Sequence, residues 1–502
     1  MSRVPVDTGS LRAQIAALDV EISAQKERLV SLQASRDALD DELRRVTVFP
    51  IDTIAPEILS EIFVQCLPED YLVGRNSVAH APLLLTRVCK EWARIATGTP
   101  ELWRNLFLLL NRGRKPEEDV AAVEFLNLWL QNCKGGLRLE LLADDEVHPQ
   151  YSDVLERIAE GAASIRSLEC GLYPDAMEEL AMHSGPFRLA NLVELSLSIK
   201  LYYYNESDLV DWGSQSKAFA KMSMLRKVSL RYIPPSSICL PWDQITDFAC
   251  DTYTAAEVLE VLQLLSNVVR LKVEVSYDEP QGELSTVIHS RLRHLEIQRS
   301  DSDEEDLDEQ LPMLQFLTLP NLESFKTDSV TEETFSEFLR RSNYPPLAAL
   351  DFVVAQNETL SDAHANIQLL SGLEHLTALK IDNAGTRMAA ELFRALQERP
   401  NLLPRLERLD VSIFSWEDTV WERLMRLLLT RQEHPSSPIL SESSGSPTPL
   451  RWVRITLSEL SRWETLVVPK RYQNALRKLK MDGLEVSILS EDLDMFWPIE
   501  GE

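Results

Sequence analysis

The chain has 502 residues, of which 44% are hydrophobic and 26% charged, an ordinary composition for one long repeat array or several globular domains. Its formal net charge of −28 disfavours binding to nucleic acid and to anionic membrane surfaces. We find no signal peptide, no membrane-spanning run, and no disulfide or zinc spacing among the six cysteines. We therefore expect a soluble protein with reduced thiols in the cytoplasm, the nucleus or both.

Residues 1–10 are expected to be disordered, and residues 11–47 are expected to form a coiled-coil helix. Eleven seam positions recur at alternating steps of four and three, nine of them aliphatic, without an intervening proline or glycine. Isoleucine at the first core position and leucine at the second favour a parallel homodimer, in which Gln25 and Arg36 are polar interruptions that fix the register. A single helix that folds back onto its own body is the alternative.

Three short helices are expected next, between residues 48 and 110. Pro56, Pro82 and Pro100 stand where a proline suits the first turn of a helix, and apolar residues follow each of them at helical spacing. Helices this short cannot bury all of these residues among themselves. An apolar surface is therefore expected to remain for a partner.

The three stretches APEILSEIF, PLLLTRVCKEWARIA and TPELW resemble the F-box in their order and spacing, especially the form abundant in fungal proteins. The resemblance covers roughly residues 48–107. It implies a three-helix module that docks on the Skp-type adaptor of cullin-RING ubiquitin ligases, and through it on the cullin and RING subunits. The positions that match the adaptor-binding face are Pro56, Ile58, Leu59, Ile62 and Phe63. Those that match the module core are Val88, Cys89, Trp92, Leu102 and Trp103.

Residues 111–490 are expected to form an irregular leucine-rich-repeat solenoid. A pattern close to L-x-x-L-x-L recurs eight times, with a weaker copy at ITDFAC, and each copy predicts a short strand with inward apolar residues. Helical stretches between the copies predict an outer layer, and weaker strands are expected at LRLELL, IRSLEC, RWVRITL and GLEVSIL. The fourth residues of the copies are Leu195, Val228, Phe248, Leu271, Leu295, Phe325, Leu350, Leu379 and Leu409.

Three segments are not expected to contribute to this array. The acidic run at 301–309 predicts a solvated loop, the Ser/Pro-rich stretch at 433–449 predicts a mobile insertion, and 491–502 is expected to be a tail. On the expected inner face of the strands, seven basic side chains balance seven acidic ones, so the sequence predicts no client charge.

Catalytic chemistry is not indicated by any motif. The sequence lacks a dinucleotide fingerprint, a phosphate loop, a nucleophile elbow and an H-E-x-x-H pair, and His289 and His294 are interpreted as surface or loop residues. We therefore expect no enzyme activity, no catalytic residues, no cofactor and no metal.

The sequence as a whole predicts an α/β chain made of an N-terminal coiled-coil helix, a three-helix F-box and an irregular leucine-rich-repeat solenoid. The resemblance implies a substrate receptor of an SCF-type ubiquitin ligase, which holds a protein client of unknown identity on its repeats. The alternative is an interaction scaffold that works without a ligase through the coiled coil and the repeats.

Overall fold

The computed structural model describes residues 8–46, 54–68, 79–110, 116–143, 152–172, 189, 191–199, 219–276, 284–299, 312–328, 331–354, 360–414, 418–432, 447–457 and 470–490. The chain is mixed α/β and forms two compact units, Met1–Leu102 and Trp103–Glu502. The predicted acidic loop, the tail, residues 1–7 of the predicted N-terminal segment and residues 433–446 of the predicted insertion lie outside the described residues.

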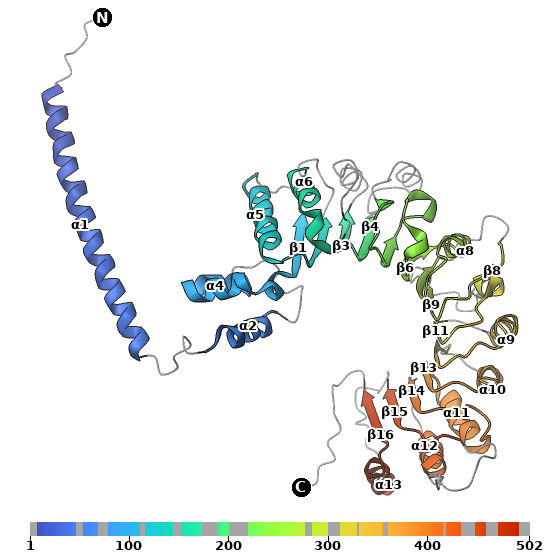
Figure 1. Ribbon diagram of the computed structural model, residues 1–502. Coiled ribbons are helices and arrows are strands. Elements are labelled where there is room, and N and C mark those ends of the chain that lie inside the picture. Colours follow the sequence, from blue (N-terminus) through green and yellow to red (C-terminus); the bar gives the residue numbers. More distant parts are fainter. Residues whose placement is uncertain are drawn as a thin grey trace, which may run out of the picture. The chain divides into compact units, whose positions relative to one another are not determined.

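The first unit begins with one long helix, α1 (Thr8–Val46), which is 39 residues long and has no break (Figure 1). The lack of proline and glycine between residues 11 and 46 accounts for this continuity. No described helix is both long and apolar enough to cross a membrane.

Short helices follow in the same unit. Pro56 occupies the first turn of α2 (Pro56–Gln65), as its missing N–H favours. The single helix expected after Pro82 is in fact two, α3 (Leu83–Val88) and α4 (Lys90–Gly98). Cys89 separates them because its backbone is extended, with φ −156° and ψ 169°, and its Sγ accepts the N–H of Trp92 at 3.5 Å as the cap of α4.

The third expected helix is only a 3₁₀ turn, Pro100–Trp103, because strand β1 (Asn105–Leu110) begins two residues later. These strand residues were expected to belong to the three-helix segment. In the structure they form the first strand of the second unit's sheet.

A fourteen-stranded parallel sheet dominates the second unit, and its strands follow one another in chain order. Figure 1 shows the strands of this unit along the inner side of an arc and its helices along the outer side. A separate pair is formed by β8 (Val287–Ile288) and β10 (Leu317–Thr318). After β1 the sheet contains β2 (Leu137–Ala143), β3 (Ile165–Leu172), β4 (Glu194–Ile199), β5 (Lys227–Arg231), β6 (Asp247–Tyr253), β7 (Arg270–Val275), β9 (His294–Arg299), β11 (Ser324–Thr327), β12 (Ala349–Val353), β13 (Ala378–Ala384), β14 (Arg408–Ile413), β15 (Trp452–Leu457) and β16 (Glu485–Ser490).

One row of paired residues crosses all fourteen strands and is apolar at every position. It contains all nine residues that the repeat pattern marked, so the predicted strands are confirmed. The four weaker strands are confirmed as β2, β3, β15 and β16. The row is Leu106, Leu139, Leu168, Leu195, Val228, Phe248, Leu271, Leu295, Phe325, Leu350, Leu379, Leu409, Val453 and Val486, all 7% exposed or less.

Helices cover the apolar face of this sheet. Phe325 of β11, for example, packs against Phe335 and Phe338 of one helix with ring centroids 5.7 and 6.1 Å apart. Short 3₁₀ turns at Ala162–Ser164, Pro235–Ser237, Trp242–Gln244 and Pro312–Phe316 replace or extend helices elsewhere. The helices of this unit are α5 (Pro116–Asn132), α6 (Ser152–Gly161), α8 (Ala255–Leu264), α9 (Glu332–Arg341), α10 (Leu360–Leu369), α11 (Thr386–Glu398), α12 (Asp418–Gln432) and α13 (Lys470–Met481).

Candidate functional site

Helix α2 has two different apolar faces. Leu59 is 3% exposed and Phe63 is 1% exposed, whereas Ile58 is 55% exposed and Ile62 is 44% exposed. Each pair is four residues apart, so each forms its own stripe along the helix. The five predicted adaptor-binding residues therefore do not share one exposed face: Pro56, Ile58 and Ile62 are accessible, and the other two side chains pack inside the unit.

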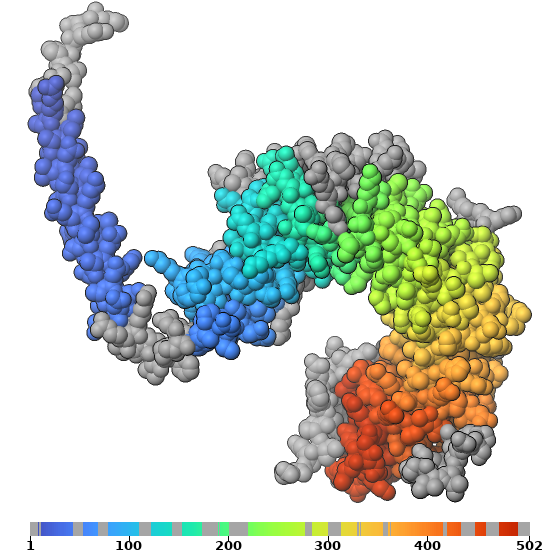
Figure 2. Space-filling model, viewed as in Figure 1, coloured from blue at the N-terminus to red at the C-terminus, as the bar shows by residue number. Residues whose placement is uncertain are grey.

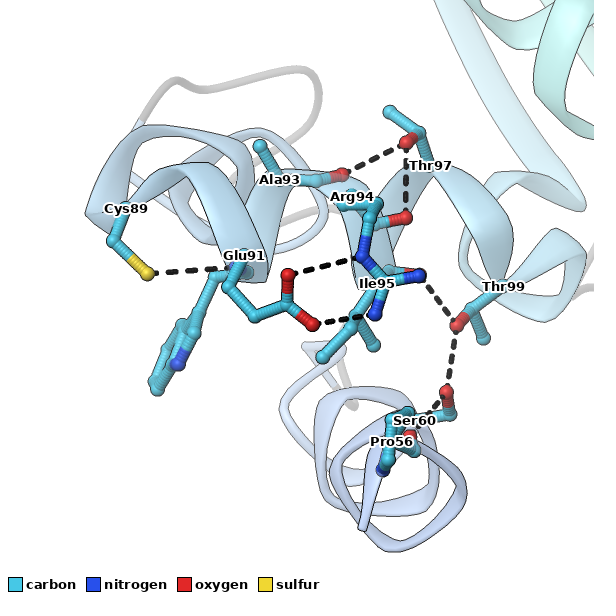
Figure 3. Close-up of polar contacts among 10 residues, drawn as sticks. Pro56, Ser60, Cys89, Glu91, Ala93, Arg94, Ile95, Thr97 and Thr99 are labelled. Atoms are coloured by element: carbon cyan, nitrogen blue, oxygen red, sulfur yellow. Dashed lines mark hydrogen bonds and ion pairs between the residues drawn. The ribbon is translucent and has the colours of Figure 1, made fainter. Parts of the chain in front are cut away.

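The inner face of α2 packs on α4. The rings of Phe63 and Trp92 lie 4.8 Å apart between centroids and are tilted by 52°. A polar contact lies beside them: the buried Thr99 hydroxyl donates to the Ile95 carbonyl at 2.8 Å and lies 3.0 Å from the Ser60 hydroxyl of α2 (Figure 3). These contacts fix which face of α2 is turned away from α4.

The predicted core positions divide between the two units. Trp92 is half-buried and its ring contacts that of Phe63, and Leu102 is 2% exposed. Trp103 is fully buried, but its ring packs edge-on against Trp129 of α5 at 5.0 Å, within the second unit. Val88, predicted to be a core residue, is 53% exposed.

Val88 shares its side of α3 with Leu84, which is 45% exposed and lies one turn earlier. The sequence pattern did not predict this second exposed stripe. The break at Cys89 is the physical reason, since it changes the direction of the backbone between α3 and α4 and so separates the apolar residues before it from those after it.

A groove of about 760 Å³ lies along the polar face of the sheet in the second unit. The space-filling view shows this unit curving around a hollow, from its cyan N-terminal part to its red C-terminal part (Figure 2). The groove is lined by side chains of twelve strands from β2 to β15, which alternate with the buried apolar residues. Eight basic and six acidic side chains line it, although the chain as a whole is strongly acidic.

Charges in the C-terminal half of this groove alternate in sign from strand to strand. Lys326 Nζ lies 2.9 Å from Glu296 Oε1, Lys272 Nζ lies 3.4 Å from the same oxygen, and Lys380 Nζ lies 3.6 Å from Asp351 Oδ2. We call this row the charge ladder. Its members, in sheet order, are Lys272, Glu296, Lys326, Asp351, Lys380, Asp410 and Arg454.

Two carboxyl groups of the charge ladder are shifted in opposite directions. Burial alone would raise the pKa of Glu296. Its hydrogen bond to Lys326 and the charge of Lys272 together lower the pKa by more than burial raises it, so the pKa is below the ordinary value. Burial raises the pKa of Asp351 above the ordinary value, because the attraction of Lys380 does not offset it.

The cations at the C-terminal end of the groove differ from the others. The Arg408 guanidinium carbon lies 5.0 Å from the ring centroid of Trp452, and that of Arg454 lies 4.8 Å from it. Within the described part of the chain, no carboxylate forms an ion pair with either arginine. Asp410 is the nearby acid that feels the charge of Arg454, and burial raises its pKa. Arg408 and Arg454 outnumber Asp410 there, so this end of the groove carries a net positive charge.

Other chemistry is limited to structural roles in the described residues. His289, predicted to be exposed or in a loop, is buried: its Nε2 donates to the Leu265 carbonyl at 2.7 Å, and its Nδ1 accepts the Leu292 N–H at 3.1 Å. Burial raises the pKa of the Cys170 thiol, which keeps it protonated. No cluster of three or more metal-binding side chains occurs among the residues that the structure describes.

Comparison with known proteins adds no assignment, since no protein-family model matches the chain and no curated protein matches it either. The two features of the described residues that bear on function are the exposed isoleucines of α2 and the groove.

Proposed function

We propose that the chain is an F-box protein with a leucine-rich-repeat solenoid, and that it acts as the substrate receptor of an SCF-type cullin-RING ubiquitin ligase. One observation carries the proposal: α2 keeps Ile58 and Ile62 exposed while Leu59 and Phe63 anchor it to α4. Two exposed apolar side chains on a helix whose opposite face is packed are suited to bind a protein partner. The proposed partner is the Skp-type adaptor.

The sheet supports the second half of the proposal. Fourteen parallel strands in chain order, with one apolar row through all of them, are what a repeat array requires, because each repeat is buried only against its neighbours. The groove on the polar face is the proposed client site. The chain would then contribute proximity between client and ubiquitin-transferring subunits, with no catalytic step of its own, in the cytoplasm or nucleus.

The excess cations suggest how a client is held. Arg408 and Arg454 have no ion-pair partner among the described residues and are held against Trp452, which leaves their N–H groups available for carboxylates. We therefore propose that the client segment carries acidic side chains at this end of the groove.

Binding to purified Skp-type adaptor tests the proposal directly. We expect wild-type chain to form a stable complex on size-exclusion chromatography, and Ile62→Glu to abolish it, because a charge would be placed in an apolar contact. Glu61→Gln, on the neighbouring exposed position, is the matched control and should bind as wild type does. If wild-type chain forms no complex, the ligase assignment fails and the alternative applies, a scaffold that acts through α1 and the groove.

A further inference from the structure

Helix α1 exposes a largely apolar seam. Seven aliphatic side chains along it are between 50% and 67% exposed. A helix with such a stripe gains most of its stability by pairing, and its length of five heptads is sufficient for a two-stranded coiled coil. The seven are Ile15, Leu18, Ile22, Leu29, Leu32, Leu39 and Leu43.

Two polar residues in the seam, Gln25 and Arg36, determine which orientation of a second copy fits. In a parallel pair in register, each seam residue faces its own copy, so two Arg36 guanidinium groups would meet between the helices. Arg36 is paired at the surface with Asp37 at 2.6 Å, and both side chains are more than 60% exposed. That contact does not neutralise a second arginine brought against the first.

An antiparallel pair removes this conflict. Gln25 and Arg36 lie equally far on either side of the point between Val30 and Ser31. When two copies cross there in opposite directions, each Arg36 faces Gln25 of the second copy, and the glutamine carbonyl can accept from the guanidinium.

The remaining seam positions fit the same register. Leu29 faces Leu32 of the second copy, Ile22 faces Leu39, and Leu18 faces Leu43, so every one of these layers is aliphatic. The register therefore pairs polar with polar and apolar with apolar along the seam.

We propose that α1 binds α1 of a second copy as an antiparallel coiled coil, with Arg36 of each helix beside Gln25 of the other. The isoleucine and leucine preferences that favoured a parallel pair are outweighed by the repulsion between two facing arginines. The C-terminal ends of the paired helices would then lie about 46 Å apart, whereas a parallel pair would keep them about 10 Å apart. The inference does not depend on the ligase assignment.

Gln25→Glu in the full-length chain distinguishes the orientations because the two predict opposite signs. In the antiparallel pair each new carboxylate faces Arg36 of the second copy, and the dimer dissociation constant should fall roughly two- to tenfold at low salt. In the parallel pair the two new carboxylates face each other, and the constant should rise. Ala34→Glu adds the same charge on the outer side of α1 and should leave the constant unchanged.

Sedimentation equilibrium of the full-length variants provides the measurement. The double variant Gln25→Arg with Arg36→Glu should also dimerise in the antiparallel pair, since each introduced arginine would face an introduced glutamate of the second copy, although it would place like charges together in a parallel pair. A wild-type chain that remains monomeric at about 100 μM overturns the proposal. So does a Gln25→Glu variant that dimerises no more tightly than wild type.

Discussion

Glu296 and Asp351 flank the same lysine, Lys326, yet their carboxyl pKa values move in opposite directions. Two ammonium groups lie within 4 Å of Glu296, and they stabilise its charged form more than burial destabilises it. Asp351 has one ammonium group at 3.6 Å, and the charge of Asp382 adds to the effect of burial. The number of close cations therefore decides whether the pKa of each carboxyl is raised or lowered.

We predict opposite pH dependences for Glu296→Gln and Asp351→Asn. The stabilisation from Glu296, whose folded-state pKa is lowered, is present above its unfolded pKa of about 4.3 and is lost as the pH falls through the folded value. The contribution of Asp351, whose folded-state pKa is raised, is present below about 3.9 and is lost as the pH rises through the folded value.

Relative to wild type, Glu296→Gln should therefore lose stability as the pH rises from about 3 to 7, and Asp351→Asn should gain it. Urea unfolding of both variants at several pH values gives the two free-energy differences. Parallel pH trends in the two variants would contradict this account of the charge ladder.

The arginine pair beside Trp452 gives a second prediction at this scale. A fluorescent peptide of eight glutamates should bind the wild-type groove, and replacing Arg408 and Arg454 together by glutamine should weaken it about tenfold, the loss of two charge-assisted contacts. Arg270→Gln is the control, because Arg270 already pairs with Asp247. Fluorescence anisotropy at low salt measures both, and equal losses in the two proteins would speak against a specific site.

Individual elements were predictable where side-chain alternation was clear. The strand marked by Leu271, for example, alternates buried and more exposed residues, and it is β7 in the structure. Strand β1 was missed because NLFLLL is a nearly continuous apolar run after a helical motif, and such a run does not distinguish a strand from a helix.

The site on α2 was only partly predictable for a related reason. Ile58, Leu59, Ile62 and Phe63 occupy adjacent stripes of one helix, and spacing alone cannot tell which stripe meets the rest of the unit. The contact of Phe63 with Trp92 makes that distinction, and it joins segments far apart in sequence.

These two stripes predict different effects for the same substitution at adjacent positions. Leu59→Glu places a carboxylate at a buried position and should destabilise the first unit by about 3 kcal/mol or more, while Ile58→Glu should change its stability by less than about 0.5 kcal/mol. Hydrogen exchange of α4 amides in the full-length chain reports on the unit. Faster exchange in Ile58→Glu than in Leu59→Glu would reverse the assignment of the faces.

At the scale of the whole molecule, the second unit depends on contacts between successive strands. Leu271 is 2% exposed in the apolar row and pairs with Phe248 and Leu295 on its two neighbouring strands. A substitution that disrupts packing at Leu271 therefore affects the neighbouring strands on both sides. The array then loses the cooperativity that continuous stacking of strands provides.

We predict that Leu271→Asp lowers the melting temperature of the second unit by several degrees, through the cost of an unpaired carboxyl in the core. Lys272→Ala is the matched control. The Lys272 side chain, next to Leu271 in the sequence, is half exposed in the groove, so its truncation should change the melting temperature little. Calorimetry of the full-length proteins compares them. A Leu271→Asp melt equal to that of Lys272→Ala would show that this row does not support the sheet.

The cations of the charge ladder are evenly spaced across the sheet. These cations, Lys272, Lys326, Lys380 and Arg454, stand on every second strand of the sheet, and strands about 4.8 Å apart place them about 9.6 Å apart. A peptide in the polyproline II conformation advances about 3.1 Å per residue and completes one turn in three residues, so residues three apart lie on the same side and about 9.3 Å from each other. In a segment that runs across the strands with an acidic side chain at every third residue, each acid would lie opposite one of the four cations. Acids at every second or fourth residue would no longer lie opposite a cation beyond the first.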